Sequence, residues 1–200
     1  MSKLVDYYFT PISPFTYLGG DRFATIIRDT GASVNVLPVG YGKIFPATGG
    51  VPLKQRAPER QAYRLAELQR WRDYLDIPLN LEPKYFPADD RIASLMIIAA
   101  RQRGDDALGL SQVFLRAVWA EERDIADTDT LVVVANEAGL DGIALLKLAD
   151  DPPISETFER DTDTAIKRGV FGAPTYVVDD EIFWGQDRLD FLERKLRASR

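Results

Sequence analysis

The amino-terminal segment predicts a strand, a helix and a second strand, and this order constrains the fold more than any other feature. Leu4–Phe9 is rich in aromatic residues and is followed by Thr-Pro, as expected of a buried strand. Ser13 is an N-cap residue followed by proline, so we expect a helix that continues to about Thr30, before a glycine. Ser33–Val39 alternates apolar residues like a second strand. Such a β-α-β unit implies a parallel strand pair with a right-handed crossover.

The middle of the chain, from about Tyr41 to Pro153, predicts helices and no strands. Gly40–Pro58 is rich in glycine and proline and is expected to be a loop, and Ile77–Pro83 to be an extended connector. Apolar residues at helical spacing and capping residues predict five helices: one with Leu65, Leu68, Trp71 and Leu75, one capped by Asp89 and Asp90 with Ile92, Leu95, Met96 and Ala99 on one face, one with Leu110, Phe114, Ala117 and Val118, one capped by Thr128, and one over Ile143–Ala149.

Strands return near the carboxyl end. A helix is expected from Ser155 to about Arg168, strands at Thr175–Val178 and Ile182–Trp184, and a final helix with Leu189, Leu192 and Leu196. A hairpin followed by a helix, together with the amino-terminal β-α-β unit, outlines a thioredoxin-like sheet. The predicted fold is therefore α/β, with a thioredoxin-like domain formed by residues 1–40 and 154–200 and a large all-helical insertion domain formed by residues 41–153.

The chain contains neither cysteine nor histidine among its 200 residues. A structural zinc site is therefore very improbable, and a Ser-His-Asp triad or an intrinsic cysteine nucleophile is excluded. The net charge of −6 argues against nucleic-acid binding, which needs a basic patch. No apolar run is long enough to cross a membrane, and the amino terminus lacks the apolar core of a signal peptide, so a cytosolic protein is expected.

Ser13 has two interpretations, which are compatible. It can act only as an N-cap whose hydroxyl accepts a backbone hydrogen bond, worth about 1 kcal/mol. It can also mark an anion site, because the amides and macrodipole of a helix start favour negative charge and would stabilise a thiolate. In a chain without cysteine, that sulfur would have to come from another molecule.

Two short segments near the carboxyl end are further candidates. Gly172-Ala173-Pro174-Thr175 is either a simple turn or a cis-proline that opens an edge strand, whose preceding residue would offer backbone N–H and C=O groups to a peptide-like ligand. The segment from Trp184 to Arg188 is either a helix cap or a site where a carboxylate and an amide face the charged ends of a ligand.

Basic residues gather in the region expected to be a loop and at the start of the following helix: Lys43, Lys54, Arg56 and Arg60. They are either solvated surface charges or the wall of a pocket for a carboxylate-bearing substrate. Tyr85 and Trp119 could supply apolar or phenolic surface for an aromatic ring.

Several short motifs in order resemble one family over almost the whole chain. They are Ser13-Pro-Phe-Thr-Tyr-Leu, Leu68-Gln-Arg-Trp71 with Ile77-Pro, Ala117-Val-Trp119, Val170-Phe-Gly-Ala-Pro-Thr175 and Trp184-Gly-Gln-Asp-Arg-Leu189. The chain resembles the 2-hydroxychromene-2-carboxylate isomerases, bacterial enzymes of naphthalene-type aromatic degradation. That family is close to the kappa-class glutathione transferases, and both belong to the disulfide-oxidoreductase branch of the thioredoxin fold.

The resemblance implies that glutathione supplies the missing sulfur, that the substrate is a small aromatic carboxylate and that the protein is a homodimer. Ser13 would hydrogen-bond the glutathione thiolate, whose reversible addition to a conjugated carbon would interconvert the cyclic 2-hydroxychromene-2-carboxylate and the open-chain trans-o-hydroxybenzylidenepyruvate. Glutathione would also be bound by Arg60, Ala173, Pro174, Trp184, Gly185, Gln186 and Asp187, and the substrate by Lys43, Arg56 and Tyr85. The chain departs from the family at Thr48-Gly49, where an asparagine is common, and at Gln186, where asparagine or serine is common.

Two alternatives to the isomerase stay open. A kappa-like transferase would conjugate glutathione to electrophiles irreversibly, and a glutathione-binding protein would keep the cleft without catalysis. A disulfide oxidoreductase is excluded, because the chain has no thiol to exchange.

Overall fold

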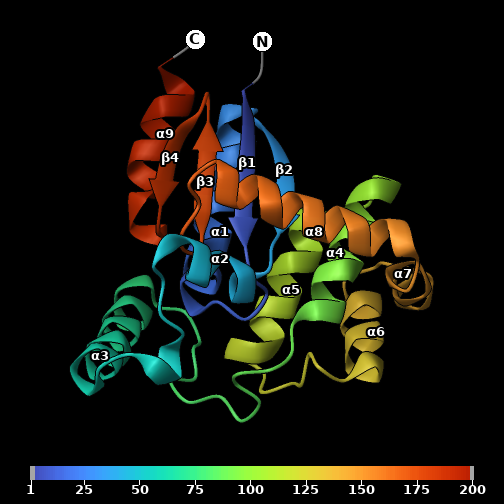
Figure 1. Cartoon of the computed structure of the whole chain (residues 1–200), viewed down its shortest axis with the longest axis horizontal. Helices are drawn as coiled ribbons and strands as arrows, with labels where there is room; N and C mark the ends of the chain where they lie inside the picture. Colours follow the sequence, from blue (N-terminus) through green and yellow to red (C-terminus); the bar gives the residue numbers. More distant parts are fainter. Residues whose placement is uncertain (1–2, 199–200) are drawn as a thin grey trace.

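A four-stranded mixed sheet stands at the centre of the molecule, with helices on both of its faces (Figure 1). The computed structural model describes residues 3–198, so the first two and last two residues of the predicted thioredoxin-like domain lie outside the described residues. The strands are β1 (Leu4–Phe9), β2 (Ser33–Pro38), β3 (Thr175–Val178) and β4 (Glu181–Trp184). They lie in the order β2-β1-β3-β4.

The helices cover the sheet and extend beyond one of its ends. They are α1 (Pro14–Thr30), α2 (Tyr41–Thr48), α3 (Pro58–Leu75), α4 (Arg91–Arg103), α5 (Ala107–Trp119), α6 (Thr128–Glu137), α7 (Gly142–Ala149), α8 (Pro152–Lys167) and α9 (Leu189–Arg197), with short 3₁₀ turns η1 (Leu53–Gln55) and η2 (Gln186–Arg188). Figure 1 shows α3 past the end of the sheet toward which β1 runs.

The pairing of the strands confirms the predicted thioredoxin-like sheet. β1 and β2 are parallel, with Tyr7 opposite Val36. β3 runs antiparallel to β1, with Tyr7 opposite Tyr176, and β4 runs antiparallel to β3. The amino-terminal β-α-β unit and the carboxyl-terminal hairpin thus share one sheet in which β1 is a central strand.

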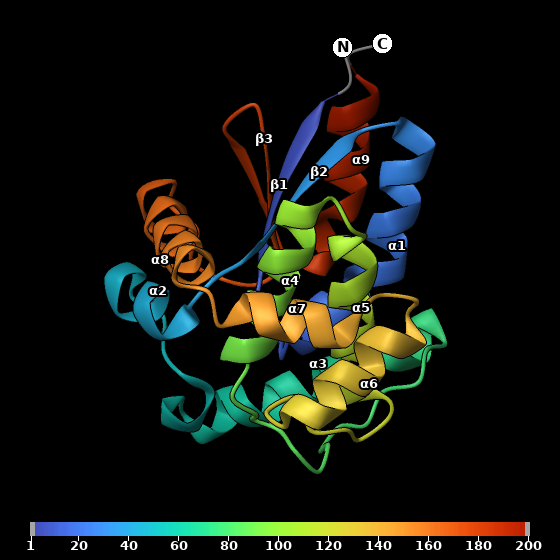
Figure 2. The ribbon, with the colours of Figure 1, turned by 90° about the vertical axis from the view of Figure 1, so that its right-hand side faces the viewer.

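Alternation along β1 divides the core between the two faces of the sheet. Tyr7 and Phe9 point to one face, where Phe23 of α1 joins a large hydrophobic cluster that also takes in α4, α5 and α9. Tyr8 points to the other face, into a smaller cluster with residues of α2 and α8. Successive side chains of a strand point to opposite faces, so one aromatic strand contributes to both layers. Figure 2 shows α1 and α9 on one side of the sheet and α2 and α8 on the other.

Helix α1 begins and ends where the sequence predicts. The hydroxyl of Ser13 accepts a hydrogen bond from the N–H of Thr16, and proline occupies the first turn. Gly31 ends the helix in the left-handed conformation, with φ of 65°. Both ends follow from local capping rules that need no tertiary contact.

The expected loop at Gly40–Pro58 is wrong in its first half, because residues Tyr41–Thr48 form α2. Tyr41 and Ile44 are buried in the smaller cluster, and the Tyr41 hydroxyl donates a hydrogen bond to the carbonyl of Gly172 at 2.8 Å. Burial of this face outweighs the low helix propensity of the glycine and proline residues in the segment. The chain leaves the helix at Gly49, whose φ is 77°.

Three smaller expectations are also corrected. Asp127, not Thr128, caps α6, because its carboxylate accepts the N–H of Thr130. Helix α8 begins at Pro152 rather than at Ser155. The strand that follows Pro174 is not an edge strand, since β3 lies between β1 and β4.

The helical part packs directly on the sheet. Helix α4 is buried from Ala93 to Ala100, on all sides rather than on the single face that the sequence suggested. One hydrophobic cluster continues from β1 through α1 into α4, α5 and α6. The thioredoxin-like fold with a helical insertion is confirmed, while the exact domain boundaries at 40 and 153 stay a prediction.

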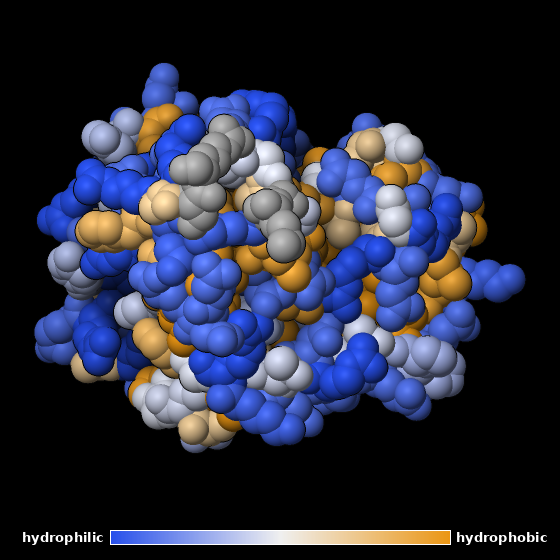
Figure 3. Space-filling model, turned by 90° about the horizontal axis from the view of Figure 1, so that it is seen from above, coloured by the Kyte–Doolittle hydropathy of each residue, from blue (hydrophilic) through white to orange (hydrophobic). Residues whose placement is uncertain are grey.

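The face of the molecule seen from above in Figure 1 is mainly polar. Viewed from the end where the chain termini lie, hydrophobic side chains form small separate patches among hydrophilic ones (Figure 3). Within residues 3–198, no helix is long and apolar enough to cross a membrane.

Candidate functional site

Ser13 lies at the carboxyl end of β1, where the chain turns into α1. Its side chain is nearly buried, at 8% exposure. The hydroxyl oxygen lies 3.2 Å from the N of Thr16, from which it accepts a hydrogen bond. A hydroxyl carries one donor and two acceptor positions, so this contact leaves the proton of Ser13 available to a ligand. A hydroxyl donor at a helix start is a suitable place for an anion.

The loop before Ser13 is held by the helical part of the chain. The indole Nε1 of Trp119 donates to the carbonyl of Ile12 at 3.3 Å. The hydroxyl of Thr10 donates to the carboxylate of Asp90, whose pKa is raised because the group is buried. On the first turns of α1, the hydroxyl of Tyr17 donates to the carbonyl of Pro78 at 2.6 Å. The position of Ser13 therefore depends on contacts with residues far along the sequence.

The Ala173–Pro174 peptide bond is cis. The carbonyl of Pro174 accepts the N–H of Gly185 at 2.9 Å, so it is not free for a ligand. Among the described residues, neither the N–H nor the C=O of Ala173 has a hydrogen-bond partner. The groups that we expected the residue before Pro174 to offer are therefore unpaired, whereas the carbonyl of Pro174, a residue that the resemblance also implied, is already engaged.

The segment from Trp184 to Asp187 forms a corner between β4 and α9. Trp184 is half-exposed and stacks edge-on against Phe171, with ring centroids 4.7 Å apart. Gly185 has φ of 101°, a conformation that L side chains rarely adopt. Gln186 is 2% exposed and packs on Gly19 of α1, where a side-chain Cβ would lie only 2.8 Å from the Cβ of Gln186. Gln186 thus joins this corner to the helix that begins at Ser13.

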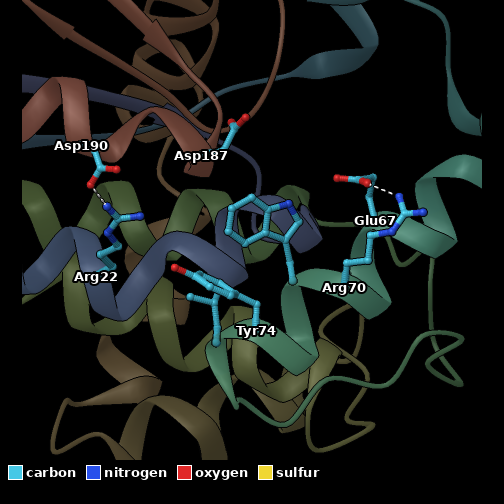
Figure 4. Close-up of a pocket in the computed structure, with 8 residues that line it drawn as sticks. Arg22, Glu67, Arg70, Tyr74, Asp187 and Asp190 are labelled. Atoms are coloured by element: carbon cyan, nitrogen blue, oxygen red, sulfur yellow. Dashed lines mark hydrogen bonds and ion pairs between the residues drawn. The ribbon is translucent and has the colours of Figure 1, made fainter.

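A cavity of about 620 Å³ lies between α3, α1 and this corner (Figure 4). Asp187 lines it, together with residues that the sequence analysis did not select: Arg22, Glu67, Arg70, Trp71, Tyr74, Leu75 and Asp190. Arg22 is paired with Asp190, and Glu67 with Arg70 at 2.6 Å. Asp187 pairs with its neighbour Arg188 at 2.9 Å, which leaves its other carboxylate oxygen to a cationic group of a ligand.

Two of the four basic residues selected from the sequence, Arg56 and Arg60, come close to each other. The pKa of Arg56 is lowered by burial and further by the charge of Arg60. Lys43 is directed elsewhere, because it pairs with Asp163 and, at 3.9 Å, with Glu159 of α8. Lys54 lies in the short turn η1, two residues before Arg56.

Arg64, which the sequence analysis missed, stands beside Arg56. Burial and the charge of Arg56 lower its pKa to about 10. We refer to Arg56, Arg60 and Arg64 as the arginine cluster. Tyr85 is half-buried next to Phe86, whose ring lies under the Arg64 guanidinium. Spacing could have pointed to Arg64, which lies one turn after Arg60 and one turn before the buried Leu68.

Comparison with known proteins identifies the family. The model of the DSBA-like thioredoxin domain matches residues 4–197. The 2-hydroxychromene-2-carboxylate isomerase of Sphingobium xenophagum is 33% identical over 201 residues, which cover 98% of this chain and 99% of that protein. This chain belongs to the 2-hydroxychromene-2-carboxylate isomerase family of DSBA-like thioredoxin proteins.

Two further comparisons agree with this assignment. A solved structure of a 2-hydroxychromene-2-carboxylate isomerase superposes with a TM-score of 0.81 at 27% identity, covering 98% of this chain and 95% of that one. Glutathione S-transferase kappa 1 of Homo sapiens is 22% identical over 208 residues, covering 98% of this chain and 92% of that protein. This chain is thus more similar in sequence to the isomerase of Sphingobium xenophagum than to the human kappa-class transferase.

Within this isomerase-family fold, residues from both ends of the chain meet at the carboxyl end of β1. Ser13 comes from the amino-terminal unit, whereas Ala173 and the corner from Trp184 to Asp187 come from the last strands. Helix α3 of the insertion forms the facing wall of the cavity. Within residues 3–198, no group of three or more acidic, histidine or cysteine side chains could hold a metal ion.

Proposed function

We propose that this protein is a glutathione-dependent isomerase that interconverts 2-hydroxychromene-2-carboxylate, or a related intermediate of aromatic degradation, and trans-o-hydroxybenzylidenepyruvate. The observation that carries the proposal is the hydroxyl of Ser13. It accepts a hydrogen bond from the N–H of Thr16 and can still donate a hydrogen bond to a ligand. A helix start of this kind stabilises a thiolate. Because this chain has no cysteine, the thiolate would come from glutathione. The isomerase relatives at 31–33% identity support the reaction class.

The residues around Ser13 fit a tripeptide such as glutathione. The N–H and C=O of Ala173 would pair with the peptide backbone, as in strand addition. Asp187 would accept the γ-glutamyl ammonium group, and Arg60 would bind the glycyl carboxylate. Trp184, Gly185 and Gln186 would shape the γ-glutamyl end of the site. Bound glutathione would supply a nucleophilic thiol that adds reversibly to a conjugated carbon.

The protein's own groups have limited tasks in this scheme. Ser13 would stabilise the thiolate form of the sulfur by donating a hydrogen bond from its hydroxyl. Arg56 and Tyr85 would orient a carboxylate-bearing aromatic substrate, while Lys43 stays a weaker candidate because its charge is paired with α8. No acid or base of the protein need titrate near neutral pH, which agrees with a chain without histidine. A homodimer in the cytosol, implied by the resemblance, completes the proposal.

The decisive experiment is a spectroscopic assay with 2-hydroxychromene-2-carboxylate in the presence and absence of glutathione. We expect the ultraviolet spectrum to change toward the equilibrium mixture only when both are present. Turnover without glutathione would contradict the mechanism. Conjugation of a general electrophile without isomerisation would instead favour the kappa-like transferase, and glutathione binding without either activity would favour a binding protein.

A further inference from the structure

Arg64 is a partly buried cation on the inner side of α3. Its side chain precedes Leu68, which is fully buried, by four residues, and Trp71 of the cavity wall by seven. Residues at this spacing lie on one face of a helix, so Arg64 is directed toward the body of the molecule rather than to solvent.

Two aromatic rings hold the guanidinium group. Its Cζ lies 5.4 Å from the ring centre of Phe86 and 5.8 Å from that of Trp119. The two rings are themselves packed together, with centroids 4.9 Å apart. Because Trp119 is also bound to the carbonyl of Ile12, one tryptophan side chain separates Arg64 from the loop that leads to Ser13.

Arg64 has no counter-ion within the part of the chain that the structure describes, where no carboxylate pairs with it and no acceptor takes its N–H groups. The two arginines of the carboxyl-terminal half of α3 differ, because Arg70 pairs with Glu67 and Arg72 with Asp73. Burial, together with the like charge of Arg56, lowers the pKa of Arg64 to about 10. A desolvated cation with cationic neighbours is unfavourable until an anion binds.

We propose that Arg64 binds the carboxylate of the aromatic substrate and is the residue that selects substrates carrying this group. The inference rests on the proposed function and adds a specificity-determining residue to it. Guanidinium N–H groups match the two oxygens of a carboxylate, and the two packed rings keep the group in a fixed orientation. Arg64 adjoins Phe86, which follows Tyr85 in the chain, whereas the residues proposed for the γ-glutamyl end of glutathione lie at the corner between β4 and α9.

Binding of a simple aromatic carboxylate tests this without turnover. The probe is trans-cinnamate, compared with the neutral trans-cinnamamide of the same shape, and each is titrated calorimetrically with and without glutathione. For Arg64→Gln we expect the affinity for cinnamate to fall about 10- to 100-fold, as for loss of a charged hydrogen-bond pair, while the affinities for cinnamamide and glutathione change less than about twofold.

Two matched variants complete the experiment. Arg72→Gln makes the same change on the same helix outside the arginine cluster and should bind cinnamate like the wild type. Arg64→Lys keeps the charge but not the planar group, so we expect a smaller loss than in Arg64→Gln. Thermal unfolding of each variant shows that it is folded, and Arg64→Lys provides the comparison if Arg64→Gln is not.

Several results would overturn the inference. These are a wild-type protein that does not distinguish cinnamate from cinnamamide, equal losses of both probes in Arg64→Gln, or a loss confined to glutathione. A protein that binds cinnamate through Arg64 yet fails to isomerise the chromene carboxylate would refute the proposed function and leave this inference standing.

Discussion

The indole N–H of Trp119 donates to the backbone carbonyl of Ile12, which immediately precedes Ser13 in the chain. This bond joins the last residue of α5, in the helical insertion, to the turn that opens α1. Trp119 is fully buried, so the bond is protected from competing water. The insertion therefore sets the position of the candidate thiolate-binding hydroxyl as well as covering the sheet.

Ser13→Ala should separate catalysis from stability. The variant loses the hydrogen bond that we propose between the Ser13 hydroxyl and the glutathione sulfur, so the isomerisation rate should fall by at least about 10-fold. The free energy of unfolding should fall by only about 1 kcal/mol, the usual value of an N-cap. Steady-state kinetics and urea denaturation measure the two effects, and a wild-type rate would remove Ser13 from the mechanism.

Asp187→Asn should weaken glutathione binding. Removal of the carboxylate that we propose as the partner of the γ-glutamyl ammonium should raise the KM for glutathione about 10-fold, with little change in kcat at saturation. Glu193→Gln is the control, because Glu193 lies on α9 and pairs with Arg197 away from the cavity. Equal KM values for the two variants would place the γ-glutamyl end elsewhere.

Gly172→Ala should disturb the corner that contains Trp184. A Cβ at position 172 would lie 2.2 Å from Nε1 of Trp184, so the indole would have to move. We expect a loss of about 1–3 kcal/mol of stability and weaker glutathione binding.

Gly42→Ala is the matched control for this change, since a Cβ there meets no atom within 4 Å and lies within α2. It should leave the stability unchanged or raise it by up to about 1 kcal/mol. Thermal denaturation of Gly172→Ala and Gly42→Ala compares their stabilities. If the two variants were equally stable, the Trp184 indole would move aside without loss of stability.

Tyr176→Phe should not destabilise the protein. The Tyr176 hydroxyl is buried and has no hydrogen-bond partner among the described residues, so its removal should leave the free energy of unfolding unchanged or raise it by up to about 1 kcal/mol. Tyr41→Phe makes the same change where the hydroxyl donates to Gly172, and it should cost about 1 kcal/mol. If Tyr176→Phe cost as much as Tyr41→Phe, Tyr176 would have an internal partner such as a water molecule.

Asp90 gives a pH dependence of stability. Burial raises the pKa of its carboxyl group above the ordinary value of 3.8, so the folded state favours the protonated form. The raised pKa of Asp90 contributes favourably to the free energy of unfolding. This contribution is fully present below the unfolded pKa and is lost as the pH rises through the folded pKa. Asp90→Asn should therefore gain stability relative to the wild type as the pH rises above the unfolded pKa of 3.8. A difference that does not vary with pH in denaturation experiments would contradict this assignment.

Local rules account for the parts of the site that lie at helix ends. Ser13 and Gly31 follow from capping preferences, and the aromatic run of β1 follows from strand propensity, so the sequence predicts all three. Helix α2 could not be predicted in this way, because Tyr41 and Ile44 are buried by segments more than a hundred residues further along the chain.

The charged residues of the site show the same difference. The sequence indicates that Arg56 and Arg60 are close, since they are near neighbours along the chain. It does not reveal that Lys43 forms an ion pair with Asp163 of α8. Nor does it reveal that Arg64 has no counter-ion among the described residues and packs on the rings of Phe86 and Trp119. Whether a cation is paired is a tertiary property, and it separates a surface charge from a candidate binding group.

The strand order β2-β1-β3-β4 has a consequence for the chain during its synthesis on the ribosome. β1 can pair with β2 as soon as residue 38 is available, but its second edge stays open until Thr175–Val178 have been made. Until then Tyr7 also lacks its stacking partner Tyr176. An unpaired aromatic strand favours aggregation, so we expect chains that stop before β3 to be insoluble or to need a chaperone.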